Sequence, residues 1–164
     1  MDLGTGAINN EYWGIKMIEI ITQEQIQNVL LNEHRQYLVG DLKLPQRLQY
    51  IYDDKVEMGI TRFEKYACEK PHFHPIVTEY QIILNGEAKY VDIEANREYM
   101  VKAGDVFVIR PNTTYIQKST EGAVILFFKY PSGNDKTLVN VTPQMRQWGD
   151  DWQKTWPVSV SEED

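Results

Sequence analysis

The chain has 164 residues, enough for one domain with a substantial core but too few for two domains of ordinary size. Its 24 acidic residues outnumber 17 basic ones, giving a formal charge of -7, and no basic run carries interleaved aromatic residues. This balance argues against nucleic acid as a partner. No apolar stretch reaches the roughly 18 residues of a membrane span, so we expect no membrane association.

The N-terminal region and the cysteine content favour a cytoplasmic protein. Residues 1–21 read as an irregular lead-in, and Asp2 together with the polar residues 9–11 interrupts the pattern of a signal peptide. Cys68 is the only cysteine, so no intramolecular disulfide can form. We therefore expect the protein in a reducing compartment, the cytoplasm.

Residues 22–140 are expected to form the main domain. A capping box, Thr22-Gln23-Glu24-Gln25, precedes apolar residues at helical spacing and predicts a short helix over residues 23–34. From residue 40 onward, short runs rich in Val, Ile, Tyr and Phe alternate with turn residues, which is typical of an antiparallel sandwich or barrel. The expected strands lie near residues 48–52, 56–66, 79–84, 87–93, 98–101, 106–110 and 123–130.

The C-terminal segment, residues 141–164, carries three tryptophans. Trp148, Trp152 and Trp156 recur every four residues, which predicts one face of a helix that packs on the barrel or across a dimer interface. Residues 161–164 form an acidic tail. Because barrel edges and exposed aromatic residues are commonly buried by self-association, we expect a homodimer.

Three candidate metal ligands lie within eight residues. His72 and His74 are two positions apart, so their imidazoles share one face of an extended strand. Glu79 would face the other way on an unbroken strand, but Pro75 lets the chain turn and return it. Two imidazoles and a carboxylate suit a divalent metal ion, Fe(II) first and also Mn, Ni or Zn. The alternative is a polar lining that no longer binds metal.

Asn85-Gly86 separates two β-rich runs and predicts a tight hairpin, because both residues tolerate a positive φ. In the resulting register, Gln81 pairs with Tyr90 and Glu79 with Asp92, which places all four side chains on one face. Gln81, Tyr90 and Asp92 are therefore candidate substrate-binding residues.

This stretch resembles the first motif of the cupin superfamily, His-x-His, four residues, Glu, six residues, Gly. His72, His74, Glu79 and Gly86 match every position. The resemblance covers roughly residues 57 to 130 and implies an all-β fold, the double-stranded β-helix or jelly-roll barrel of cupins, with a short N-terminal helix and a C-terminal helical segment. Cupins include dioxygenases, decarboxylases, sugar isomerases and epimerases, and binding proteins, so function must be argued from the site.

The second cupin motif is matched only in part. Gly104 begins it, but Arg110-Pro111-Asn112-Thr113-Thr114-Tyr115 stands where Pro-x-Gly-x-x-His would end, so Tyr115 occupies the place of the last histidine ligand. His34 precedes the barrel and is not expected to bind metal. Tyr115 then has three candidate roles, as a phenolate ligand, a proton donor or part of the wall. Arg110 is a candidate clamp for a carboxylate or phosphate.

A weaker resemblance, from Asp41-Leu42 to Leu84-Asn85-Gly86-Glu87, is to small cupin-like proteins related to the β-galactosidase subunit family, and it implies a sugar-like ligand. We expect a metal-dependent enzyme of the isomerase or epimerase type acting on a small polar molecule. The alternatives are an Fe(II)-dependent dioxygenase and a non-enzymatic cupin that binds a small molecule. The expected roles are catalysis for Tyr115 and Glu79, substrate binding for Gln81, Tyr90, Asp92 and Arg110, and metal binding for His72, His74 and Glu79.

Overall fold

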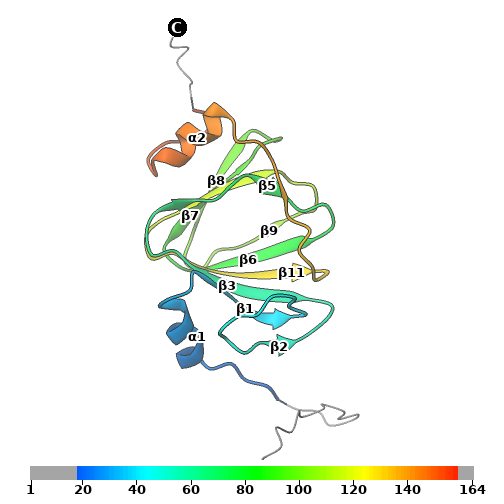
Figure 1. Ribbon diagram of the computed structural model, residues 1–164. Coiled ribbons are helices and arrows are strands. Elements are labelled where there is room, and N and C mark those ends of the chain that lie inside the picture. Colours follow the sequence, from blue (N-terminus) through cyan, green and yellow to red (C-terminus); the bar gives the residue numbers. More distant parts are fainter. Residues whose placement is uncertain (1–17, 159–164) are drawn as a thin grey trace, which may run out of the picture.

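The computed structural model describes residues 18–158, and within this range the chain forms twelve strands and two helices (Figure 1). The predicted tail of residues 161–164 and most of the predicted lead-in lie outside the described residues. The elements are α1 (Gln23–Leu30), β1 (Arg35–Gly40), β2 (Ile51–Tyr52), β3 (Glu57–Arg62), β4 (Ala67–Cys68), β5 (His72–Phe73), β6 (Thr78–Asn85), β7 (Glu87–Asp92), β8 (Arg97–Lys102), β9 (Val106–Ile109), β10 (Tyr115–Ser119), β11 (Val124–Tyr130), β12 (Thr137–Leu138) and α2 (Pro143–Asp150).

Two sheets face each other and enclose the core. One has the strand order β2-β1-β3-β11-β6-β9, and the other has the order β12-β5-β10-β7-β8, with β4 added beside β10. Ile83 and Ile125 from the first sheet meet Ala88, Tyr90 and Tyr115 from the second in one buried cluster. The predicted all-β fold with two short helices is confirmed.

Each helix covers the outer face of a different sheet, and Figure 1 shows them at opposite ends of the molecule. The capping box at Thr22 is present, but α1 stops at Leu30, four residues before the end of the predicted helix. Residues 35–40 form β1 instead, because alternate side chains there are buried against β3 and the helix. Leu30 of α1 packs with Leu38 and Ile60 on the outside of the first sheet.

The predicted hairpin at Asn85-Gly86 is wrong. Strand β6 pairs with β11 and β9, whereas β7 pairs with β10 and β8, so this turn carries the chain from one sheet to the other. Gly86 has a φ of +73°, and a Cβ at this position would lie 2.8 Å from the Cα of Ala123. Only Gly86 adopts the positive φ that was predicted for both residues, since Asn85 is the last residue of β6, and a positive φ does not reveal which strands pair on either side.

The three tryptophans do not share one helix. Only Trp148 lies on α2, while Trp152 and Trp156 follow its last residue. The spacing of four residues does not indicate a single helix here, because Trp152 and Trp156 lie on an irregular segment after α2. Trp148 is fully buried against Val91 on the outer face of the second sheet, so the predicted packing on the barrel is confirmed. Neither helix within residues 18–158 has the length and apolar character needed to cross a membrane.

The C-terminal segment is held to the barrel by Lys118 of β10, a strand that the sequence analysis missed. The side chain of Lys118 is fully buried. Its ammonium group donates to the carbonyl oxygens of Trp148, Asp151 and Lys154, at 2.9, 2.9 and 2.8 Å. All three ammonium protons therefore have partners, which is what allows a buried lysine in this strand.

Candidate functional site

A small polar cavity lies between the two sheets. His72 comes from β5, His74 from the loop after it, Glu79 and Gln81 from β6, and Tyr115 from β10. All five line the cavity, whose volume is about 40 Å³. That space holds on the order of three water molecules. The interior as it stands therefore suits an ion with its water ligands, or one end of a larger molecule.

His72 is held in a single tautomer. Its Nδ1 donates to the carbonyl oxygen of Lys70 at 2.9 Å, because a carbonyl can only accept, so Nε2 keeps its lone pair. The ring is 3 % exposed and packs against Tyr115, with ring centroids 4.4 Å apart. Burial lowers the pKa of His72 to about 4. The imidazole is therefore neutral at physiological pH, the state in which it binds metal.

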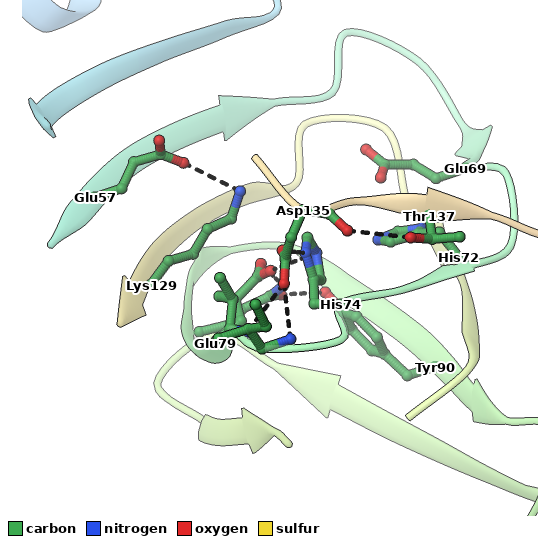
Figure 2. Close-up of polar contacts among 12 residues, drawn as sticks. Glu57, Glu69, His72, His74, Glu79, Tyr90, Lys129, Asp135 and Thr137 are labelled. Atoms are coloured by element: carbon green, nitrogen blue, oxygen red, sulfur yellow. Dashed lines mark hydrogen bonds and ion pairs between the residues drawn. The ribbon is translucent and has the colours of Figure 1, made fainter. Parts of the chain in front are cut away.

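His74 lies between two carboxylates. Its Nδ1 donates to Oδ1 of Asp135 at 2.6 Å, and its Nε2 lies 3.4 Å from Oε2 of Glu79 (Figure 2). The other oxygen of Asp135 accepts from the backbone N–H groups of Ile76 and Val77, at 2.9 and 3.0 Å. These bonds to the charged form hold the pKa of Asp135 below its usual value, against the opposing effect of burial. Asp135 thereby fixes both the ring and the loop that carries it.

The hydrogen bonds continue from Glu79 to the second sheet. Gln81 Nε2 donates to Glu79 Oε1 at 2.6 Å, and the hydroxyl of Tyr90 donates to Gln81 Oε1 at 2.6 Å. Glu79 and Gln81 meet because both point inward from β6, at alternate positions. Since both ends of the Gln81 amide are occupied, Gln81 positions Glu79. The sequence had suggested that Tyr90 and Gln81 pair along one β-ladder. Tyr90 instead reaches Gln81 across the barrel.

Tyr115 is 4 % exposed and lines the cavity beside His72. Burial, and next the negative charge of Glu79, raise the pKa of Tyr115 well above its usual value. The side chain is therefore a neutral phenol at physiological pH, a form that donates a hydrogen bond or a proton. Of the three roles considered from the sequence, these surroundings argue against the phenolate ligand and leave the proton donor and the part of the wall.

The donor atoms can be compared with the requirements of a metal ion. Two ligands about 2.1 Å from one ion at a tetrahedral angle lie about 3.4 Å apart, which is the separation of His74 Nε2 and Glu79 Oε2. The ring centroids of His72 and His74 lie 5.4 Å apart. Within residues 18–158, no three His, Cys, Asp or Glu side chains converge closely enough to form a ready-made metal site. The types and tautomers of these donors fit an ion, although the three side chains do not yet converge on one point.

Three basic residues also line the cavity: Arg35 of β1, Lys129 of β11 and Lys136 of the segment before β12. The guanidinium of Arg35 bonds Glu69 at 3.0 Å and Thr61 at 2.8 Å. Lys129 points inward to Glu57, 3.1 Å away (Figure 2). The sequence analysis assigned no role to any of them. The inward direction of Lys129 could have been found, since it alternates with Ile125 and Phe127 on one strand face.

Two of the residues proposed from the sequence lie elsewhere. Asp92 accepts from the backbone N–H of Ala95 at 3.0 Å in the β7–β8 turn, and it does not line the cavity. Arg110 is exposed after β9 and is likewise absent from the lining. Both predictions depended on local patterns. The hairpin register placed Asp92 at the site, and the position in the second cupin motif placed Arg110 there. Tyr90 does not line the cavity either but bonds Gln81, which does, and the other proposed residues come together around the cavity.

The comparisons with known proteins agree with this architecture. The family model described as cupin matches residues 55–148, more than half of the chain. The chain belongs to the cupin family, as its first motif suggested. A comparison with curated proteins gave no match.

Solved structures give distant matches. One is KdgF from Halomonas sp., with 16 % identity over 52 % of this chain and 77 % of that chain, at a TM-score of 0.46. A second is the polyketide cyclase RemF from Streptomyces resistomycificus, with 16 % identity over 61 % and 71 %, at 0.47. A third is an uncharacterized protein with a double-stranded β-helix domain from Klebsiella pneumoniae, with 16 % identity over 62 % and 89 %, at 0.48. Similarities this distant do not bear on activity.

Proposed function

We propose that this protein is a metal-binding cupin that acts on a small polar, sugar-like molecule by proton transfer, in the manner of an isomerase or epimerase. The observation that carries the proposal is the continuous set of contacts from Asp135 through His74 to Glu79 and on to Gln81. Such a set orients the donor atoms of His74 and Glu79 without closing the site. Carboxylates and carbonyls bonded to the far nitrogen of a histidine are the usual supports of a metal ligand.

The residues that would hold a divalent ion are His72 and His74, through Nε2, and Glu79, through Oε2. An ion bound there would supply Lewis-acid polarisation of a carbonyl or hydroxyl oxygen. Tyr115, as a neutral phenol beside His72, is placed to donate a proton to that oxygen as negative charge develops on it. Gln81 and Asp135 act through Glu79 and His74 and are positioning residues.

Elemental analysis of protein purified without a metal-affinity column tests the proposal. The wild type is compared with His72→Ala, His74→Ala and the control His34→Ala, whose ring bonds the carbonyl oxygen of Arg62 outside the cavity. We expect about one equivalent of one metal in the wild type and the control, and loss of metal from both cavity variants. A wild type that stays metal-free after incubation with Fe, Mn, Ni and Zn salts would contradict the proposal and favour the non-enzymatic binding protein.

The ion that is found then decides between the two enzyme classes. Two histidines and a carboxylate equally suit Fe(II) in oxygenases, so iron directs the assay to oxygen uptake. Zinc, manganese or nickel directs it to isomerisation of sugars. In either assay, Tyr115→Phe should keep its metal and lose turnover, because the change removes only the hydroxyl. Full turnover in this variant would leave Tyr115 as part of the wall.

A further inference from the structure

The cavity and an outer hollow share three charged lining residues. Arg35, Glu69 and Lys136 line the interior cavity and also line this open hollow, whose volume is about 600 Å³. A molecule too large for the interior would therefore pass these three side chains and could leave its remainder in the hollow. The charges at this junction decide what kind of molecule is accepted there.

Most of the charge around the cavity is already neutralised. Arg35 is paired with Glu69 at 3.0 Å, and Lys129 is paired with Glu57 at 3.1 Å. Lys136 has no ion-pair partner among residues 18–158. Within the described residues, Lys136 is therefore a cation without an ion pair at the junction, in a site that also holds the carboxylates of Glu79 and Asp135.

The position of Lys136 is set by the residues on either side of it. Asp135 is bound to His74 and to two backbone N–H groups. On the other side, Thr137 and Leu138 pair with Phe73 and His72 of β5. Lys136 is thus carried on a segment held at both ends by the residues of the site. This fixes the backbone at Lys136, while its exposed side chain lines both the cavity and the hollow.

We propose that Lys136, with Arg35 beside it, binds the carboxylate of an acidic substrate, a hydroxy acid or sugar acid with a single negative charge. One unpaired ammonium group can bond one carboxylate. A phosphate ester would bring a second negative charge next to Glu69, and the other lysine there without an ion pair within the described residues, Lys70, lines only the outer hollow. Arg35 can contribute as well, because its Nη1 makes no hydrogen bond within residues 18–158, whereas Nε and Nη2 are engaged.

This inference names the substrate class of the proposed function and rests on it for the chemistry, but the carboxylate subsite is tested separately by binding. Isothermal titration measures the affinity for glucuronate and lactate, each against its uncharged counterpart, glucose or propane-1,2-diol. Inorganic phosphate is the second anion. The variants are Lys136→Gln, Lys136→Arg and the control Lys102→Gln, an exposed lysine of β8 that lines neither the cavity nor the hollow.

We expect at least one acid to bind the wild type about tenfold more tightly than its uncharged counterpart, since a charge-assisted hydrogen bond contributes at least that ratio. Lys136→Gln should lose the preference, while Lys136→Arg and Lys102→Gln keep it. Equal affinity for acid and uncharged counterpart, no binding of either acid, or a preference that survives in Lys136→Gln would overturn the inference. Tighter binding of phosphate, dependent on Lys136, would overturn the assignment to a carboxylate.

Metal content measured on the same samples separates this inference from the proposed function. Lys136→Gln should retain the metal of the wild type, because Lys136 contributes no ligand. A metal-free wild type that still prefers the acid through Lys136 would contradict the metal-dependent function and support the carboxylate subsite. A metal-loaded wild type without any preference for the acid would support the metal-dependent function and contradict the carboxylate subsite.

Discussion

The buried pair of Lys129 and Glu57 allows a direct test of the charge balance around the cavity. The two residues are opposite each other on β11 and β3, each is 8 % exposed, and Lys129 Nζ lies 3.1 Å from Glu57 Oε1. In Lys129→Met, the carboxylate of Glu57 would stay buried without a partner. Removal of one partner from a buried ion pair costs about 3–5 kcal/mol, and we expect the free energy of unfolding to fall by that amount.

The double variant Lys129→Met with Glu57→Gln removes both charges. Because neither side chain then carries an unpaired buried charge, its free energy of unfolding should return to within about 1 kcal/mol of the wild type. With a similar cost for Glu57→Gln alone, the coupling energy between the two positions would be at least about 5 kcal/mol. The ring of Phe127, whose centroid lies 5.1 Å from Lys129 Nζ, accounts for a small loss that the double variant does not recover.

Urea denaturation followed by circular dichroism at pH 7, at low and at high salt, measures these differences. A buried pair is screened little by salt, so the coupling should change little between the two conditions. Additive costs below about 1 kcal/mol for the two single variants would refute the reasoning. Lys129 would then be a solvated cation available to a ligand, and Lys136 would lose its distinct position in the charge balance.

Three further predictions concern stability. Because burial lowers the pKa of His72 from its usual 6.5 to about 4, the unfolded chain takes up a proton first as the pH falls. The unfolding free energy of chelator-treated protein should therefore drop by up to about 3 kcal/mol as the pH falls from 6.5 to 4. His72→Gln should flatten this dependence of the unfolding free energy on pH. The same pH dependence in the variant and the wild type would contradict the prediction. Gly59→Ala would place a Cβ in steric overlap with Cζ of Phe127, so we expect a loss of about 3 kcal/mol in the free energy of unfolding and a lower Tm. An unchanged Tm would show that the ring moves freely. Lys118→Met removes three hydrogen bonds to carbonyl groups and should cost about 3 kcal/mol, with faster hydrogen exchange over residues 148–154; retained protection there would disprove the anchoring role.

The proposed ligand residues could be picked out from the sequence because they are close together in it, and all three line the cavity. His72, His74 and Glu79 lie within eight residues, and the side-chain period of two places the histidines together whatever the rest of the fold does. The residues that orient and surround them are not local. Asp135 comes 61 positions after His74, and Arg35 lies on a strand that the helical pattern before it had concealed.

The errors share a physical origin. A strand pattern and a turn residue describe one segment, whereas sheet pairing depends on segments far away. Asn85-Gly86 therefore suggested a hairpin, although β6 and β7 belong to different sheets. Strand β10 was missed because all five of its residues are buried, with one sheet face toward the core and the other under α2, so no polar and apolar alternation remains.

Asp135 and Lys136 are consecutive, so the residue that orients His74 and the residue proposed to bind the ligand share one stretch of backbone. If Lys136 binds a ligand as proposed, that ligand also restrains the backbone that presents Asp135 to His74, and we expect the two interactions to be thermodynamically linked. By the reciprocity of linkage, whatever strengthens the hold of Asp135 on His74 also raises the affinity for the ligand. A substitution that loosens residues 132–138 should therefore weaken both at once, even though it touches neither the ligand nor the imidazole.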